Sequence, residues 1–205
     1  MPFTTEQFFE VFRLYNEAAE PAQIVLSLLA IAAIALIFVR GGGGRVIVAI
    51  LALLWLWMGA GYHLYFFTRI NTAAYAFAAF FIVQAGIFIY EGVYSRQILF
   101  APRYDFRGVA GSVFIIYALI LYPLLGQLAG HEYPAAPTFG TPCPTTIFTF
   151  GILMFSAARL PTLVYAIPFV WSLIGAAAAV LLNVPQDLGL LAAGAIGTLL
   201  LYKQR

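Results

Sequence analysis

Long apolar stretches, separated by short polar or basic breaks, make up most of the chain. A bilayer core of about 30 Å takes about 20 apolar residues per helix. On that measure the pattern predicts seven transmembrane helices in a single membrane domain, residues 1–205. The predicted spans are residues 22–39, 46–67, 72–90, 109–129, 144–159, 162–182 and 188–202. The fifth and sixth share one apolar run that is too long for a single span, and the break Arg159-Leu160-Pro161 divides it.

The first twenty residues show a different pattern, with apolar residues at helical spacing and charged residues between them. The apolar face consists of Phe8, Val11, Phe12 and Tyr15, and the opposite face of Glu6, Glu10, Arg13 and Glu17. Thr4 followed by Gln7 fits a capping box. Residues 2–20 are therefore expected to form a short amphipathic helix lying in the membrane interface.

Composition also indicates an integral membrane protein. Hydrophobic residues make up 63% of the chain and charged residues 9%, whereas soluble domains carry about 25% charged residues. The expected fold is an all-α integral membrane bundle whose principal partner is the lipid bilayer. A net charge of +2 with scattered carriers excludes a nucleic-acid-binding surface.

The basic residues predict the orientation, because Lys and Arg gather in cytoplasmic loops. With seven spans one side carries Arg40, Arg45, Arg96, Arg103, Arg107, Arg159, Lys203 and Arg205, and the other carries only Arg13 and Arg69. This distribution predicts an outer N-terminus and a cytoplasmic C-terminus.

The predicted outer loop between spans four and five, residues 131–146, contains four prolines that restrict its backbone. Cys143 is interpreted as a helix cap with Pro144 at the first helical position. Unpaired N–H groups would then face Cys143, Thr145 and Thr146, where they can bind an anion or lower a thiol pKa. These residues, together with Tyr62, are candidate ligand-binding residues. The alternative is a rigid plug in which Cys143 is a small, inert, buried side chain.

Both histidines, His63 and His131, fall on the same predicted outer face. With Glu132 and Cys143 they offer nitrogen, oxygen and sulfur donors suited to a transition metal such as copper or zinc. No regular metal-ligand spacing is present, so the four side chains would have to converge through folding. The alternative is that the histidines only hydrogen-bond and titrate.

Within the predicted spans, Gln84 and Glu91 are seven residues apart and lie on one helical face. They are candidates for a polar path across the membrane. The alternative is that Gln84 hydrogen-bonds a neighbouring helix and Glu91 pairs with an inner arginine. Asn71, Asn183 and Asp187 are interpreted as helix caps.

Some classes of function require a residue or motif that this sequence does not contain. The only lysine, Lys203, follows the last span, which excludes a retinal Schiff base. There is no hydrolase, zinc-protease or phosphate-loop motif, so enzymatic turnover is the least favoured class. A weak likeness between Trp55-Leu56-Trp57-Met58-Gly59-Ala60 and Trp171-Ser172-Leu173-Ile174-Gly175-Ala176 suggests a repeat, as found in some transporters.

The chain resembles a family of small multi-pass bacterial inner-membrane proteins catalogued only as a domain of unknown function. The segments that carry the resemblance are Gly61-Tyr62-His63, Pro137-Thr138-Phe139-Gly140 through Pro142-Cys143-Pro144-Thr145-Thr146, and Val184-Pro185-Gln186-Asp187-Leu188-Gly189. The resemblance implies a bacterial plasma membrane location and no particular chemistry.

Three functions remain open at this point. The first is transport or permeation of a small solute or ion through the bundle, from an outer-facing binding site. The second is a redox or metal- or haem-binding membrane subunit that uses His63, His131, Glu132 and Cys143. The third is a scaffold, as a homo-oligomer or with partners in a membrane complex, because Ala- and Gly-rich helices pack closely. Transport requires no unseen cofactor and is preferred.

Overall fold

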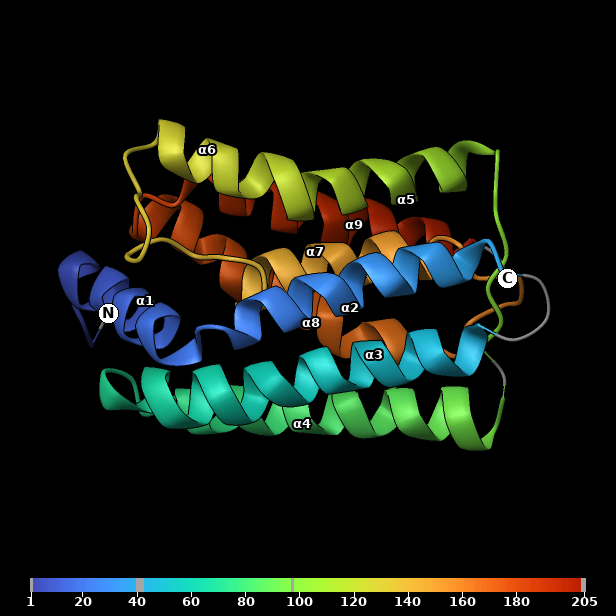
Figure 1. Cartoon of the computed structure of the whole chain (residues 1–205), viewed down its shortest axis with the longest axis horizontal. Helices are drawn as coiled ribbons and strands as arrows, with labels where there is room; N and C mark the ends of the chain where they lie inside the picture. Colours follow the sequence, from blue (N-terminus) through green and yellow to red (C-terminus); the bar gives the residue numbers. More distant parts are fainter. Residues whose placement is uncertain (1, 40–42, 97, 204–205) are drawn as a thin grey trace.

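A computed structural model describes residues 2–39, 43–96 and 98–203. Its helices pack side by side in an elongated bundle (Figure 1). They are α1 (Thr5–Ala19), α2 (Ala22–Ile37), α3 (Gly44–Trp57), α4 (Ala74–Phe88), α5 (Phe106–Ile116), α6 (Tyr122–Leu128), α7 (Pro142–Leu153), α8 (Leu163–Leu181) and α9 (Leu188–Tyr202). π-Helical turns extend α3 (Met58–Phe66) and α4 (Ile89–Tyr94) and join α5 to α6 (Tyr117–Leu121). The described residues contain isolated β-bridges but no β-strand.

Four continuous helical stretches in the described part of the chain are long and apolar enough to cross a membrane. They are Gly44–Arg69, Ala74–Tyr94, Phe106–Leu128 and Leu163–Leu181. A fifth results if α1 and α2 count as one span, although the chain bends by 85° between them. Large apolar side chains are also exposed on the outside of the bundle, as along α2 at Ile24, Leu28 and Ile31. The predicted all-helical fold is confirmed for the described residues, and four to five of its helices are long and apolar enough to span a membrane.

Helix α7 differs from the predicted span 144–159, because it ends at Leu153 after 12 residues. At about 1.5 Å per residue it is shorter than a bilayer core. Every residue of α7 except Cys143 is buried. The chain then leaves the helix and pairs with residues 99–101, with hydrogen bonds from Ala101 N to Phe155 O (3.0 Å) and from Ala157 N to Leu99 O (2.8 Å). The apolar residues of α7 are therefore covered by protein, which hydropathy alone cannot distinguish from lipid.

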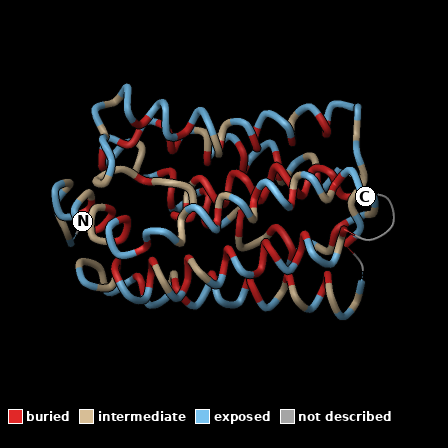
Figure 2. The backbone as a smooth tube through the Cα atoms, viewed as in Figure 1, coloured by how far each residue is buried: buried red, intermediate tan, exposed pale blue. Residues whose placement is uncertain are grey.

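The amphipathic helix α1 forms as predicted, with reciprocal hydrogen bonds between Thr4 and Gln7 in a capping box. Its apolar face does not remain free for an interface, however. Phe8, Phe12 and Tyr15 are buried against the bundle, where their rings contact those of Tyr62, Phe66 and Phe67. Figure 2 shows this inward side as buried. Helix α1 is therefore part of the protein core at one end of the bundle.

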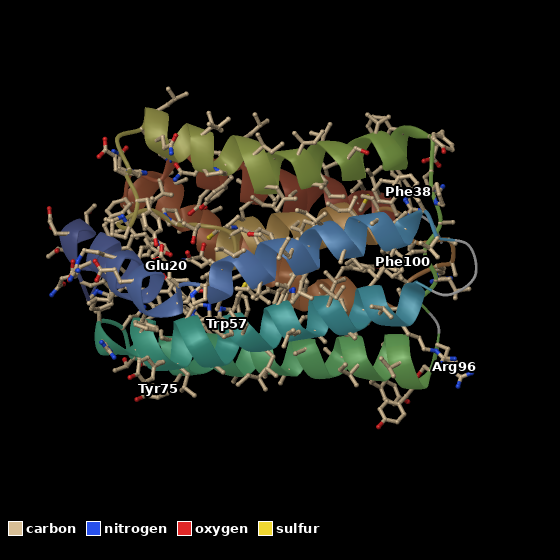
Figure 3. The ribbon with its side chains drawn as sticks, in the orientation of Figure 1. Glu20, Phe38, Trp57, Tyr75, Arg96 and Phe100 are labelled. Carbon is tan, nitrogen blue, oxygen red and sulfur yellow. The ribbon has the colours of Figure 1, made fainter. Side chains whose placement is uncertain are left out.

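The two ends of the bundle are made of different elements. Helix α1 and the residue 129–141 loop lie at one end, called the α1 end, and the C-terminus lies at the other, called the C-terminal end (Figure 1). Glu20 and Tyr75 lie toward the α1 end, whereas Phe38, Arg96 and Phe100 lie toward the C-terminal end (Figure 3). The predicted cluster of eight basic residues includes Arg40 and Arg205, which lie outside the described residues.

Candidate functional site

A cavity of about 190 Å³ lies at the α1 end, enclosed by α1, the π-helical end of α3, the start of α7 and the second half of α8. Its lining is mostly aromatic and aliphatic. The polar side chains in the lining belong to Tyr62, His63, Asn71, Thr141, Cys143 and Trp171, and none of the lining residues is charged. A concave, mainly apolar pocket with a few polar groups is the usual form of a small-molecule site.

His63 is the most unusual residue of this lining. Its side chain is 0% exposed, and neither ring nitrogen has a hydrogen-bond partner among the described residues. Aromatic rings surround it, with Phe81 at 4.7 Å and Trp171 at 5.0 Å between ring centroids. A buried imidazole normally forms hydrogen bonds with both ring nitrogens, since leaving one nitrogen without a partner costs about 1–3 kcal/mol. The π-helical turn that presents His63 is itself a feature frequently found at functional sites.

Trp171 and Cys143 face the cavity from α8 and α7. The indole Nε1 of Trp171 is buried without a nitrogen or oxygen partner among the described residues, and it hydrogen-bonds the Cys143 thiol. Gly175 lies beside both side chains, because a Cβ built there would be 3.4 Å from Cys143 Sγ and from Trp171 Nε1. Three of the polar groups in the lining therefore come from segments far apart in the sequence.

The predicted cap at Cys143 is wrong, and the start of α7 brings only some of the predicted ligand-binding residues to the cavity. The cap is Thr141, with Pro142 at the first helical position, so Cys143 lies inside the helix. Thr145 accepts a hydrogen bond from Gly140 N (3.2 Å), and Thr146 donates one to Pro142 O (2.8 Å). Neither threonine lines the cavity. Their hydroxyl groups hold the first turn of α7 in place, and only Tyr62, His63 and Cys143 of the predicted ligand-binding residues line the cavity.

His131 and Glu132 lie away from this cavity. The His131 ring lies 4.4 Å from that of Phe9, and its Nδ1 lies 3.5 Å from Gln186 Nε2. Glu132 is exposed. Among the described residues no three His, Cys, Asp or Glu side chains are close enough to hold a metal ion together. The proposed metal ligands His63, His131, Glu132 and Cys143 are thus not brought together, and the arrangement offers the transition-metal hypothesis no support.

Sequence reasoning missed Asp187. It was interpreted as a helix cap, but its side chain makes no capping hydrogen bond to α9 and is 2% exposed. Tyr122 Oη donates to Asp187 Oδ1 at 2.6 Å, and the Cys143 thiol also hydrogen-bonds the carboxyl group. Burial raises the pKa of Asp187 to about 7. The only local signal, an aspartate at a helix start, is the same for a cap and for a buried acid.

Gln84 and Glu91 are both buried, but neither lines the cavity. Gln84 Nε2 donates to Val164 O on α8 at 2.9 Å, so Gln84 joins two helices. Glu91 forms no ion pair with the cations of the described residues. The interhelical role of Gln84 is present, whereas the inner arginine partner of Glu91 is not seen.

Asn16 on α1 fixes the proline-rich loop that leads into α7. Its Nδ2 donates to Pro134 O (2.6 Å) and Ala136 O (2.8 Å), and its Oδ1 accepts from Gln23 and Thr138. Asn16 is fully buried. The loop is therefore held in place by hydrogen bonds to α1 as well as restricted by its prolines.

Replacing Asn16 by alanine is expected to lower the free energy of unfolding by about 2 kcal/mol, because two half-buried carbonyls lose their donor and the Gln23 and Thr138 side chains lose their acceptor. Thermal unfolding in detergent and limited proteolysis within residues 130–141 would measure the effect. Gln127→Ala, at an exposed position of α6, serves as the control and should change stability by less than about 0.5 kcal/mol. Equal stability of the two variants would contradict the role given to Asn16.

Comparison with known proteins identifies the family of this chain but gives no activity, substrate or cofactor. Searches among curated proteins and among solved structures each give no match. A family model described only as a family of unknown function, DUF6064, matches residues 5–205. The resemblance seen in the segments around His63, Cys143 and Asp187 is therefore confirmed, and because the match covers almost the whole chain, the protein belongs to the DUF6064 family of unknown function.

Proposed function

We propose that this protein transports, or allows permeation of, a small solute across the bacterial plasma membrane, and that the cavity at the α1 end is its outer-facing binding site. One observation supports the proposal most directly. Helix α7 begins inside the bundle, and the cavity at its start contains a buried histidine without hydrogen-bond partners.

The physical argument concerns what an interrupted helix does in a membrane protein. Irregular backbone at membrane depth is tolerated where it is buried in protein or lines a cavity. In many transporters such interrupted helices direct their free N–H groups at the solute-binding site. Thr141 caps α7 without a side-chain hydrogen bond, and Thr141, Pro142 and Cys143 line the cavity. Pro142 and Pro144 have no backbone N–H, so Cys143 is the only one of the first three residues of α7 that carries this donor. Solute bound there would meet this part of the helix and His63.

The topology that we propose with this function has seven membrane crossings, an outer N-terminus and a cytoplasmic C-terminus. In it, α2, α3, α4, α5 with α6, α8 and α9 each cross once, and short α7 crosses together with the extended segment that follows it. The excess of basic residues away from α1 supports this orientation. The exposed apolar side chains of the helices would then face lipid.

Further along the bundle from the cavity, Gln84 on α4 and Glu91 on its π-helical extension are proposed to continue a polar path. Gln84 Oε1 is buried without a partner, although its amide nitrogen is bound to Val164 O. Glu91 lies one and a half to two turns further along the same helix, 8% exposed. Both groups would gain hydrogen bonds from a passing solute or water molecule.

Stopped-flow light scattering of proteoliposomes tests the function with acetamide, glycerol and benzamide as solutes. At least one solute should cross faster than in protein-free liposomes. His63→Phe should lower that permeability about tenfold, which corresponds to one lost hydrogen bond of about 1.4 kcal/mol. His131→Phe is the matched control and should leave permeability within twofold.

Permeability equal to that of protein-free liposomes for all three solutes would overturn the transport proposal. A Gln84→Leu, Glu91→Gln double variant tests the path separately. Unchanged permeability in that variant would remove the polar path while leaving the binding site intact.

A further inference from the structure

The cavity at the α1 end also indicates which class of molecule it takes. No lysine, arginine, aspartate or glutamate is among its lining residues. A charged ligand would lose its hydration there without meeting an opposite charge, which costs several kcal/mol. An uncharged ligand therefore suits this lining.

The polar groups of the lining set the second requirement, because neither ring nitrogen of His63 has a partner among the described residues and Trp171 has only the weak thiol acceptor of Cys143. An indole N–H can only donate, and a neutral imidazole donates from one nitrogen and accepts at the other. His63 is neutral in this environment, because an imidazolium would be buried among aromatic rings without a counter-ion. Trp171 and His63 together call for an oxygen acceptor on the ligand.

Size and shape set the third requirement. An apolar protein cavity of about 150 Å³ holds one benzene molecule, and this cavity measures about 190 Å³. The rings of Phe8, Phe12, Phe67, Phe77 and Trp171 form much of the lining, and aromatic rings pack well against another ring in stacked or edge contacts. A molecule with a single ring and a small polar group fits this space.

The exposed part of the lining shows how such a molecule would enter. The most exposed lining side chains on α8 are apolar, with Ile174 at 37% and Leu181 at 57%. Helix α8 is one of the four helices of membrane-spanning length. Its exposed apolar side faces lipid if the helix crosses the bilayer, so the open edge of the cavity would face the membrane.

From these observations we infer that the cavity binds an uncharged, single-ring molecule carrying a carbonyl or hydroxyl oxygen, held between His63 and Trp171 and admitted from the membrane side. The inference rests on the same site as the proposed transport function. Two sources share this chemistry, namely a free aromatic amide or alcohol and the ring head group of a membrane lipid such as an isoprenoid quinone. Entry beside Ile174 and Leu181 suits either source.

Equilibrium dialysis of the full-length protein in nanodiscs, with empty nanodiscs as the reference, tests the ligand class. Benzamide supplies the ring and the neutral carbonyl, toluene lacks the oxygen, and benzoate adds a charge. Benzamide should bind at least about tenfold more tightly than toluene or benzoate. His63→Phe and Trp171→Phe should each reduce that preference about tenfold, whereas Trp57→Phe, at an indole outside the cavity lining, should not.

Solvent extraction of the purified protein distinguishes the two sources. A ring-headed lipid recovered at about one per protein and lost in His63→Phe supports the class with a lipid source. Selective benzamide binding without such a lipid supports it with a free ligand. No benzamide selectivity together with no ring-headed lipid overturns the inference. Binding without solute flux in proteoliposomes would contradict only the transport proposal.

Discussion

Replacing Asp187 by asparagine is expected to make the protein more stable than the wild type at pH 8, with little difference at pH 4. The Asp187 carboxyl group is buried, and its partners, the Tyr122 hydroxyl and the Cys143 thiol, are neutral. Burial raises its pKa from 3.8 to about 7. Asparagine keeps an oxygen that can accept from Tyr122 and introduces no charge.

The sign of the expected stability difference follows from the linkage between proton binding and folding. Between pH 4 and pH 7 the folded protein holds a proton on Asp187 that the unfolded chain has already lost. The contribution of Asp187 to the free energy of unfolding is therefore fully present below pH 4 and is lost as the pH rises to about 7. The two pKa values correspond to a loss of about 4 kcal/mol, taken as an order of magnitude. His131, beside Gln186, titrates in both proteins and so cancels from the comparison.

Thermal unfolding in detergent at several pH values would measure this effect. Asp105→Asn is a control of opposite sign, because the Arg103 guanidinium holds the pKa of the exposed Asp105 carboxyl well below its usual range. That variant should lose stability at neutral pH rather than gain it. A wild type and Asp187→Asn variant with parallel pH profiles would show that Asp187 does not titrate in the folded protein.

Gly151→Val is expected to destabilise the protein by about 3 kcal/mol or more and to reduce the yield of folded protein. Helices α5 and α7 approach closely at Gly111 and Gly151. A Cβ on Gly151 would lie 2.7 Å from Ile115 Cγ1 and 3.0 Å from Gly111 O, and valine adds two methyl groups to that contact. Overpacking costs about 1–3 kcal/mol even where side chains can adjust, and the Gly111 carbonyl belongs to a helix backbone.

The matched control is Gly86→Ala on α4, where an added Cβ would meet no atom within 4 Å. Alanine favours a helix over glycine by up to about 1 kcal/mol, so this variant should be as stable as the wild type or slightly more stable. Melting temperature and monodispersity in size-exclusion chromatography would report both variants. A Gly151→Val protein that matches Gly86→Ala in both measurements would contradict the close approach of α5 and α7.

Several features of the fold were predictable because they depend on neighbouring residues alone. The capping box of Thr4 and Gln7 is a contact across one helical turn, and it forms as predicted. The long apolar helices follow from the hydropathy of the chain, and four of them in the described residues are long enough to cross a membrane. The bounds of the last helix, residues 188–202, agree with the predicted span.

The candidate site was predictable only in part. The position of His63 and Cys143 near one end of the bundle followed from where their helices end, and both line the cavity. The sequence distinguishes Trp171 only by its likeness to Trp55, although the two indoles differ: Trp55 donates to Thr149 Oγ1 at 3.0 Å, whereas Trp171 lies beside the Cys143 thiol. Whether an indole is paired depends on its neighbours from other helices.

The amino-acid sequence by itself determined that this chain forms long apolar helices, where most of them lie, and to which family the chain belongs. Hydropathy and local capping carry that information, because each depends on a residue's own transfer free energy or on contacts within one turn. The tertiary structure alone decided that α1 docks on the bundle, that α7 stops after 12 residues inside it, and that Asp187 is buried beside Cys143 and Tyr122. Those outcomes depend on contacts between segments up to about a hundred residues apart, whose free energies no local pattern records.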